Sequence, residues 1–199
     1  MNFLAHLYLS RDLSEEVIIG NFIADSVKGR IAYNAYPAAV QLGIEIHREI
    51  DQYSDSHPLF KVGTKRLHSA YGKYASIIMD IYYDHILAHN WEQYHQLPLQ
   101  DFATAQYALI ERQDHHMPEF TRFWFGVMKN DNLLHAYASE AGIEDVLKRM
   151  DRRTQLASGM GKAIHELRTY KADYTAEFFL FFEDMQQNLK DKFPGIWGV

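Results

Sequence analysis

Hydrophobic residues recur every three to four positions along most of the 199-residue chain, which is the spacing of helices with one buried face. Alternation of hydrophobic and polar positions, the mark of a half-buried strand, is hard to find. Neither a proline- or serine-rich linker nor an internal repeat interrupts the pattern. The sequence therefore predicts a single all-α domain over residues 1–199, a bundle of roughly eight or nine helices.

Capping and breaking residues predict where these helices lie. Ser14, followed by two glutamates, is typical of a helix start, and a proline suits the first helical turn. Glycines such as Gly29 and Gly72 are expected to end helices. The expected helices cover residues 2–9, 14–27, 37–54, 58–72 and 74–91, begin again at Pro98 and Pro118, are punctuated by Gly142, Gly159 and Gly161, and end with a long helix over 162–192.

Composition narrows the class of protein. The chain has no cysteine, which excludes disulfides, thiolate nucleophiles, cysteine-ligated zinc and iron–sulfur clusters and suits a cytoplasmic protein. Its 20 Lys+Arg and 26 Asp+Glu give a net charge of −6, and neither half has a basic excess, so general nucleic-acid binding is disfavoured. The apolar opening segment stops at Arg11, and we expect neither a signal peptide nor a membrane span.

Histidine and aspartate occur together at helical spacings in the first 100 residues. His47, Asp51 and Asp55 stand four residues apart, so one imidazole and two carboxylates can face the same cavity. Imidazole nitrogens and carboxylate oxygens are together the ligands of manganese, iron or zinc ions. An ordinary solvated pair of His47 and Asp51 would produce the same spacing, so this pattern alone leaves both interpretations open.

Three other groups stand out against apolar neighbours. Asp80 and Asp84 share one helix face, and His85 and His89 share another, in a helix that is expected to be largely buried. Four ionisable groups in such a helix favour a functional site, because burying unpaired charge is costly.

The two remaining groups are less specific. Asn21 and Asp25 share a face of an apolar helix, where the carboxylate needs a metal, a substrate or an ion pair with Lys28. His6 interrupts an apolar helix, and a hydrogen-bonded core histidine is the ordinary explanation.

With these residues identified, the sequence resembles the acyl carrier protein phosphodiesterases, also called acyl carrier protein hydrolases. The motifs that carry the resemblance occur in the same order within residues 1–95. They are Met1–Leu7, Gly20–Gly29, Gly43–Asp51 and Asp80–Leu87. From about residue 96 onward, only helical character and length agree.

The resemblance implies a reaction and a metal site. Members remove the 4′-phosphopantetheine arm from holo-acyl carrier protein with a divalent cation, usually Mn²⁺, with Mg²⁺, Fe²⁺ or Zn²⁺ as alternatives. The fold would be a divergent relative of the all-α His-Asp phosphohydrolases, in which Ala24 occupies the position of the usual histidine and His47 replaces that imidazole. The implied metal ligands are His6, Asp25, His47, Asp51, Asp80 and Asp84.

Catalytic roles follow from the same resemblance. Lys28 and Arg48 would contact the phosphoryl oxygens, and His85 would either protonate the leaving oxygen or form a buried hydrogen bond. The substrate partner, holo-acyl carrier protein, is acidic, so an enzyme of net charge −6 needs a local basic surface. Two clusters qualify: Lys61, Lys65, Arg66 and Lys73, and Lys148, Arg149, Arg152 and Arg153.

Two other functions stay open. One is a phosphohydrolase of the same fold that acts on a nucleotide or another small phosphodiester. The other is a metal-free helical binding module whose histidines and aspartates are simply paired. Neither a nucleic acid nor a membrane is an expected partner.

Overall fold

The chain is helical throughout, and the computed structural model describes residues 1–197. No β-strand occurs over that range, which confirms the all-α prediction. The α-helices are α1 (Phe3–Ser10), α2 (Glu15–Ile23), α3 (Gly29–Asn34), α4 (Ala38–Ser56), α5 (Pro58–Tyr71), α6 (Ala75–His89), α7 (Leu99–Arg112), α8 (Glu119–Asn130), α9 (Leu133–Ala136), α10 (Glu140–Arg153), α11 (Ile164–Thr169) and α12 (Lys171–Lys192), with short 3₁₀ helices between several of them.

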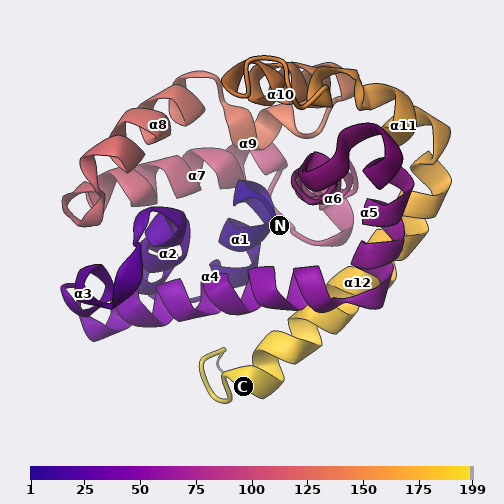
Figure 1. Cartoon of the computed structure of the whole chain (residues 1–199). Helices are drawn as coiled ribbons and strands as arrows, with labels where there is room; N and C mark the ends of the chain where they lie inside the picture. The colour runs from indigo at the N-terminus through magenta and orange to yellow at the C-terminus, as the bar shows by residue number, and fades with distance from the viewer. Residues whose placement is uncertain (198–199) are drawn as a thin grey trace.

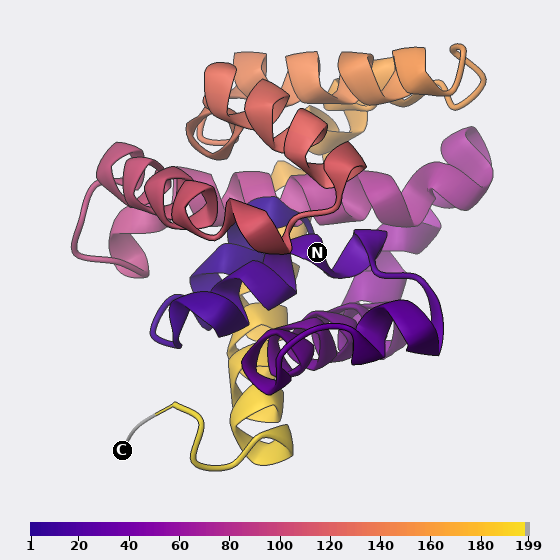
Figure 2. The same ribbon diagram turned by 90° about the vertical axis from the view of Figure 1, so that its left-hand side faces the viewer.

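The helices surround α1. In Figure 1, α4 lies below α1, α6 and α5 lie to one side, and α10 closes the top. The N-terminus lies in the middle of the molecule in this view and in the view turned by 90° (Figure 2), whereas the end of α12 lies at its edge. A functional group on α1 is therefore held inside the bundle.

One hydrophobic core joins these helices into a single domain. Its centre is aromatic: Tyr82 and Tyr83 of α6 pack against Phe178, Phe181 and Tyr174 of α12, and all five are 0% exposed. Burial of each such side chain contributes about 2–3 kcal/mol. Within residues 1–197, no helix combines the length and the apolar character that crossing a bilayer requires.

Two glycines bring α2 and α4 into direct backbone contact. A Cβ atom at Gly20 would lie 2.1 Å from the carbonyl oxygen of Val40, and one at Gly43 would lie 2.0 Å from that of Val17. No other residue type fits these positions without moving a helix. The contact fixes the distance between the two helices that carry Asn21 and His47.

The structure corrects several expected boundaries. The helix expected over 14–27 ends at Ile23 and continues as a 3₁₀ turn, Ala24–Ser26. Gly29, expected only to end a helix, begins α3 with φ of 79°. The long helix expected over 162–192 is two helices, because the chain bends at Tyr170 (φ −111°, ψ 23°). With α3, α9 and this break, residues 1–197 contain twelve α-helices rather than eight or nine.

Gly142 also has a different role from the one expected. It lies inside α10 instead of breaking a helix. A Cβ atom there would lie 2.0 Å from the carbonyl oxygen of Ala136, so glycine allows α10 to approach α9 closely. Gly142 is therefore required by a close contact between two helices and does not mark a helix end.

Gly43→Ala is expected to lower the free energy of unfolding by about 2–3 kcal/mol, because the methyl group would overlap the backbone of α2. Urea unfolding measures this change. Gly126→Ala is the matched control: Gly126 is also helical, and nothing lies within 4 Å of its added Cβ. That variant should be unchanged or more stable by up to about 1 kcal/mol. Equal stabilities of the two variants would contradict a tight α2–α4 contact.

Candidate metal centre

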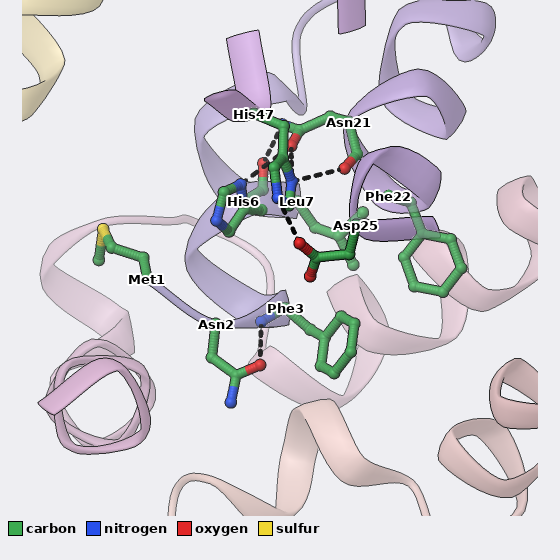
Figure 3. A pocket seen from close by; sticks show the side chains of 9 residues that line it. All are labelled: Met1, Asn2, Phe3, His6, Leu7, Asn21, Phe22, Asp25 and His47. Carbon is green, nitrogen blue, oxygen red and sulfur yellow. Dashed lines mark hydrogen bonds and ion pairs between the residues drawn. The ribbon is translucent and has the colours of Figure 1, made fainter. Parts of the chain in front are cut away.

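Two histidines and an aspartate from separate helices form a compact cluster. His6 comes from α1, and His47 and Asp51 come from α4; one potential ligand atom of each lies within 4.8 Å of the others. The two imidazole rings stack with their centroids 4.1 Å apart. Figure 3 shows the rings side by side next to Asn21 and Asp25. The structure thus brings together three of the ligands predicted from the sequence.

Asn21 determines which nitrogen of each histidine faces the cluster. Its Nδ2 donates to the backbone carbonyl of His6 at 2.9 Å, which fixes the amide orientation. His6 Nδ1 then donates to Asn21 Oδ1 at 3.0 Å, and His47 Nδ1 donates to the carbonyl oxygen of Asn21 at 2.8 Å. Because these acceptors assign a proton to each Nδ1, the neutral rings carry their lone pairs on Nε2.

Both Nε2 atoms face carboxylates. Asp51 Oδ1 lies 3.1 Å from His6 Nε2, and Asp51 Oδ2 lies 3.1 Å from His47 Nε2. Asp25 Oδ1 lies 3.4 Å from the same His47 atom. The buried His47 Nε2 has no well-directed hydrogen bond to any group of residues 1–197. A lone pair facing a carboxylate requires a cation between them, either a proton or a metal ion.

The pKa values agree with this requirement. Burial, and then the neighbouring His47, lowers the pKa of His6 to about 4. Burial also acts to lower the pKa of His47, but the carboxylates of Asp25 and Asp51 outweigh it and raise that pKa to about 9. The imidazoles in turn hold the pKa of Asp51 well below its usual range, although its burial opposes them. Positive charge is therefore favoured at His47 Nε2.

Asp84 lies apart from the cluster and holds α1 in place. Its Oδ2 accepts from the amide of Leu4 at 2.7 Å, and its Oδ1 accepts from the amides of Asn2 and Ala5 at 3.3 and 3.2 Å. Burial raises the pKa of Asp84 to about 7, while the Leu4 amide opposes the shift. Asp84, which the resemblance implied as a metal ligand, thus holds α1, the helix that carries His6, in position.

Asp80 contacts the other end of the same segment. Its Oδ1 lies 2.9 Å from the Met1 ammonium, which also lies 3.5 Å from Asp51 Oδ1. Burial raises the pKa of Asp80, and the ammonium counteracts this shift. Within residues 1–197, Asp80 makes no hydrogen bond or ion pair with the cluster itself. Its link to the cluster is the Met1 ammonium, which also contacts Asp51.

The predicted catalytic residues lie elsewhere. His85 is buried and its Nδ1 donates to the carbonyl oxygen of Tyr137 at 2.7 Å, which is the hydrogen-bonding alternative considered for it. Arg48 donates to the carbonyl oxygen of Val27 at 3.3 Å, and Lys28 is exposed at the start of α3. Within residues 1–197, none of the three makes a hydrogen bond or ion pair with the cluster.

The cluster adjoins a cleft of about 970 Å³. The small pocket in Figure 3, which both histidines line, shares Phe22 and Asp25 with this cleft. Asp51, Asp55 and Asp80 line its side formed by α4 and α6. On the other side α8, α9, α10 and the segment between α9 and α10 contribute a largely apolar and aromatic wall with three arginines. It includes Phe120, Trp124, Phe125, Met128, Leu133, Tyr137, Val146, Met150, Arg149, Arg152 and Arg153.

The sequence indicated the three arginines of this wall as part of a basic cluster, but not its apolar and aromatic part. The local signal for that part is the aromatic face of α8, where Phe120 lines the cleft and is 68% exposed. A helical pattern rich in aromatics predicts burial in a core, so exposure of this face becomes visible only in the folded chain.

The fold and the site define an all-α protein in which two buried histidines face partly exposed carboxylates beside a cleft. The sequence model of the family described as acyl carrier protein phosphodiesterase matches residues 1–185. The chain belongs to this family and is an enzyme. The match also extends well beyond residues 1–95, to which the motif resemblance was confined.

Curated relatives agree with this assignment. Proteins named acyl carrier protein phosphodiesterase from Photorhabdus laumondii and Serratia proteamaculans are each 33% identical over 195 residues, which is 96% of this chain and 96% and 99% of theirs. One from Escherichia coli O157:H7 is 28% identical over 194 residues, covering 96% of this chain and 99% of its own. No solved structure matches the chain.

Asp84→Asn is expected to lower the free energy of unfolding by about 2 kcal/mol, because an NH₂ group would face backbone amides that need an acceptor. Urea unfolding tests this expectation. Asp55→Asn is the control, since Asp55 is exposed and accepts no hydrogen bond from residues 1–197. If the two variants were equally stable, the anchoring role of Asp84 would be wrong.

Proposed function

We propose that this enzyme hydrolyses the phosphodiester that joins 4′-phosphopantetheine to holo-acyl carrier protein, releases apo-acyl carrier protein, and requires a divalent metal ion, with Mn²⁺ the first choice. The observation that carries the proposal is that the Nε2 atoms of His6 and His47 both face the carboxylate of Asp51 beside a cleft. Family membership, together with the names of the relatives, supplies the substrate class.

The donor set suits the metal. His6 Nε2, His47 Nε2 and a carboxylate oxygen of Asp51 would hold the ion, and Asp25 offers a further oxygen from the 3₁₀ turn after α2. Mixed imidazole and carboxylate ligands match Mn²⁺, Fe²⁺ or Zn²⁺ better than Mg²⁺. When bound, such an ion neutralises phosphodiester charge and makes water acidic enough to act as a nucleophile near pH 7.

The chain's own residues orient this donor set. Asn21 accepts from each Nδ1, so that each Nε2 faces Asp51, where a metal ion would take the place of the proton that His47 holds. Asp84 fixes the first turn of α1, and the α2–α4 contact fixes the position of His47 relative to Asn21. Asp80 and Asp84 therefore act as positioning residues in this proposal, and the ligand set is smaller than the one that the resemblance implied.

The cleft suits the prosthetic arm. Its volume of about 970 Å³ is at the upper end of the roughly 300–1,000 Å³ found for small-molecule sites. A long flexible arm whose phosphate is held at the histidine cluster needs a channel that leads away from that cluster. In this proposal, the cleft is that channel, and the arm lies along its aromatic wall on α8.

One of the two basic clusters is better placed to bind an acidic carrier protein. Arg152 and Arg153 line the cleft, and neither has a carboxylate partner within residues 1–197. Arg153 stacks on Trp124, with its guanidinium carbon 3.7 Å from the ring centroid. Their neighbours Lys148 and Arg149 are already paired, with Glu144 and with Asp131 and Asp145.

The other cluster is less suited. Arg66 is held by Glu177 at 2.6 Å, and none of Lys61, Lys65, Arg66 and Lys73 lines the cleft. We therefore assign carrier-protein docking to Arg152 and Arg153, whose free charge complements an acidic partner.

A second candidate function uses the same cluster on a nucleotide or another small phosphodiester. The exposed ring of Phe120 and the half-buried ring of Trp124 lie on the cleft wall and favour this second function, because a nucleotide base can stack on them. Strong hydrolysis of an aryl phosphodiester without release of the arm from holo-acyl carrier protein would select this function. The binding module considered from the sequence is excluded, because the chain is an enzyme.

Mass spectrometry of holo-acyl carrier protein incubated with the enzyme and Mn²⁺ tests the main proposal. The expected result is loss of the arm, abolished by EDTA and restored by Mn²⁺. His47→Ala and Asp51→Ala should each lower kcat/KM by at least about 100-fold, since each removes a ligand. Asp173→Ala, which removes an exposed carboxylate of α12 that does not line the cleft, should keep most activity. Full turnover in excess EDTA would refute metal dependence.

Arg152→Glu and Arg153→Glu should each raise KM for holo-acyl carrier protein about five- to tenfold at low salt, and less at high salt, because screening weakens charge attraction. Steady-state kinetics at several salt concentrations measure the effect. Lys61→Glu, an equal charge change at an exposed residue away from the cleft, is the control. Unchanged turnover of both arginine variants at every salt concentration would remove this surface from consideration.

A further inference from the structure

Tyr137 presents a polar group that the proposed function has not used. It lies between α9 and α10, is 0% exposed and lines the cleft. Its hydroxyl has no hydrogen-bond partner within residues 1–197. A buried hydroxyl without a partner is unfavourable, so such a group in a cleft wall indicates a place where a ligand supplies the missing acceptor.

Other buried tyrosines show what distinguishes Tyr137. Tyr82 donates to the carbonyl oxygen of Ala163, and Tyr107 donates to that of Met128. Tyr83 and Tyr174 also have unpartnered hydroxyls in the described part of the chain, but they lie in the aromatic core between α6 and α12 and do not line the cleft. Tyr137 is the tyrosine in residues 1–197 that combines a buried, unpartnered hydroxyl with a place on the cleft.

The surroundings define the kind of acceptor. Burial, and then the carboxylate of Asp84, raises the pKa of Tyr137 well above its ordinary value, so the phenol remains a neutral donor. Asp80 is a second nearby carboxylate, and Arg153 is the nearby cation. Two carboxylates disfavour a bound anion beside Tyr137, whereas an uncharged carbonyl oxygen fits a neutral donor in a largely apolar wall.

His85 holds Tyr137 in position. Its Nδ1 donates to the backbone carbonyl oxygen of Tyr137 at 2.7 Å, and its side chain is buried in α6. This bond ties the short segment between α9 and α10 to the helix that carries Asp80 and Asp84. His85 thus does not line the cleft itself but holds the backbone of Tyr137, which does.

We propose that the Tyr137 hydroxyl positions the substrate by donating a hydrogen bond to an amide carbonyl oxygen of the pantetheine arm, and that His85 acts as a positioning residue for Tyr137. The inference rests on the proposed function and adds an arm-binding site to it. The arm has two amides, and its phosphate would lie at the histidine cluster. Tyr137 therefore contributes to binding of the arm and not to cleavage of the phosphodiester.

Tyr137→Phe tests the proposal, because it removes one oxygen and keeps the ring. Calorimetric titration with pantetheine, which lacks the phosphate, should show a Kd about fivefold higher than for the wild-type enzyme. With holo-acyl carrier protein, KM should rise about fivefold while kcat stays within about twofold. Tyr83→Phe and Tyr174→Phe remove equally buried hydroxyls away from the cleft and should change neither value.

Variants of His85 test its positioning role. His85→Asn keeps a donor near the position of Nδ1 and should bind pantetheine like the wild-type enzyme, whereas His85→Leu should weaken binding about as much as Tyr137→Phe. In the double variant the two losses should not add, since they interrupt one interaction. If His85→Leu does not fold, the asparagine variant and Tyr137→Phe still decide the question.

The outcomes separate this inference from the proposed function. A wild-type enzyme that leaves holo-acyl carrier protein intact refutes the proposed function, even if it binds pantetheine. Equal pantetheine affinity of the wild-type enzyme and Tyr137→Phe, or no binding to either, overturns the assignment of Tyr137. A fall in kcat with unchanged KM also overturns it, because that result would place the hydroxyl at the reacting phosphodiester.

Discussion

The backbone contact between α2 and α4 is the constraint on which the candidate site depends. Because Gly20 and Gly43 have no side chains, the two helices approach closely enough for the carbonyl oxygen of Asn21 to accept from His47 Nδ1 at 2.8 Å. A helix pair separated by ordinary side chains would lie about 8–10 Å apart, and Asn21 would lose this contact. The packing of two small residues thus determines the tautomer of a candidate metal ligand.

Electrostatics then organise the cluster. Asp51 faces two Nε2 atoms, and Asp84 binds three amides at the start of α1, so the carboxylates serve different purposes. Asp51 would hold the cation of the proposed function, whereas Asp84 accepts hydrogen bonds from the backbone amides at the N-terminus of α1, which have no acceptor within the helix. The family resemblance grouped these two aspartates as metal ligands, although their partners in the folded chain are unlike.

The cleft connects this centre to the other half of the chain. Its acidic side comes from α4 and α6, and its apolar and arginine-bearing side comes from α8, α9 and α10. This asymmetry matches a substrate with a phosphodiester at one point, a long arm and an acidic carrier. The hydrogen bond from His85 to Tyr137 joins the two sides, so residues 80–85 contribute to both.

Local sequence determined the helical class and most boundaries, because periodicity, prolines and caps act within a few residues: α4, α5 and α6 begin and end close to their expected positions. Helical spacing also indicated His47 and Asp51, although it left a metal site and a solvated pair open, and only the family resemblance added His6 to them. Tertiary structure decided the rest. The bend at Tyr170 has no glycine or proline to announce it, and the cleft wall is assembled from helices that are far from the cluster along the chain. Which acid faces the histidines, and which accepts from a helix N-terminus, depends on distances that only packing sets.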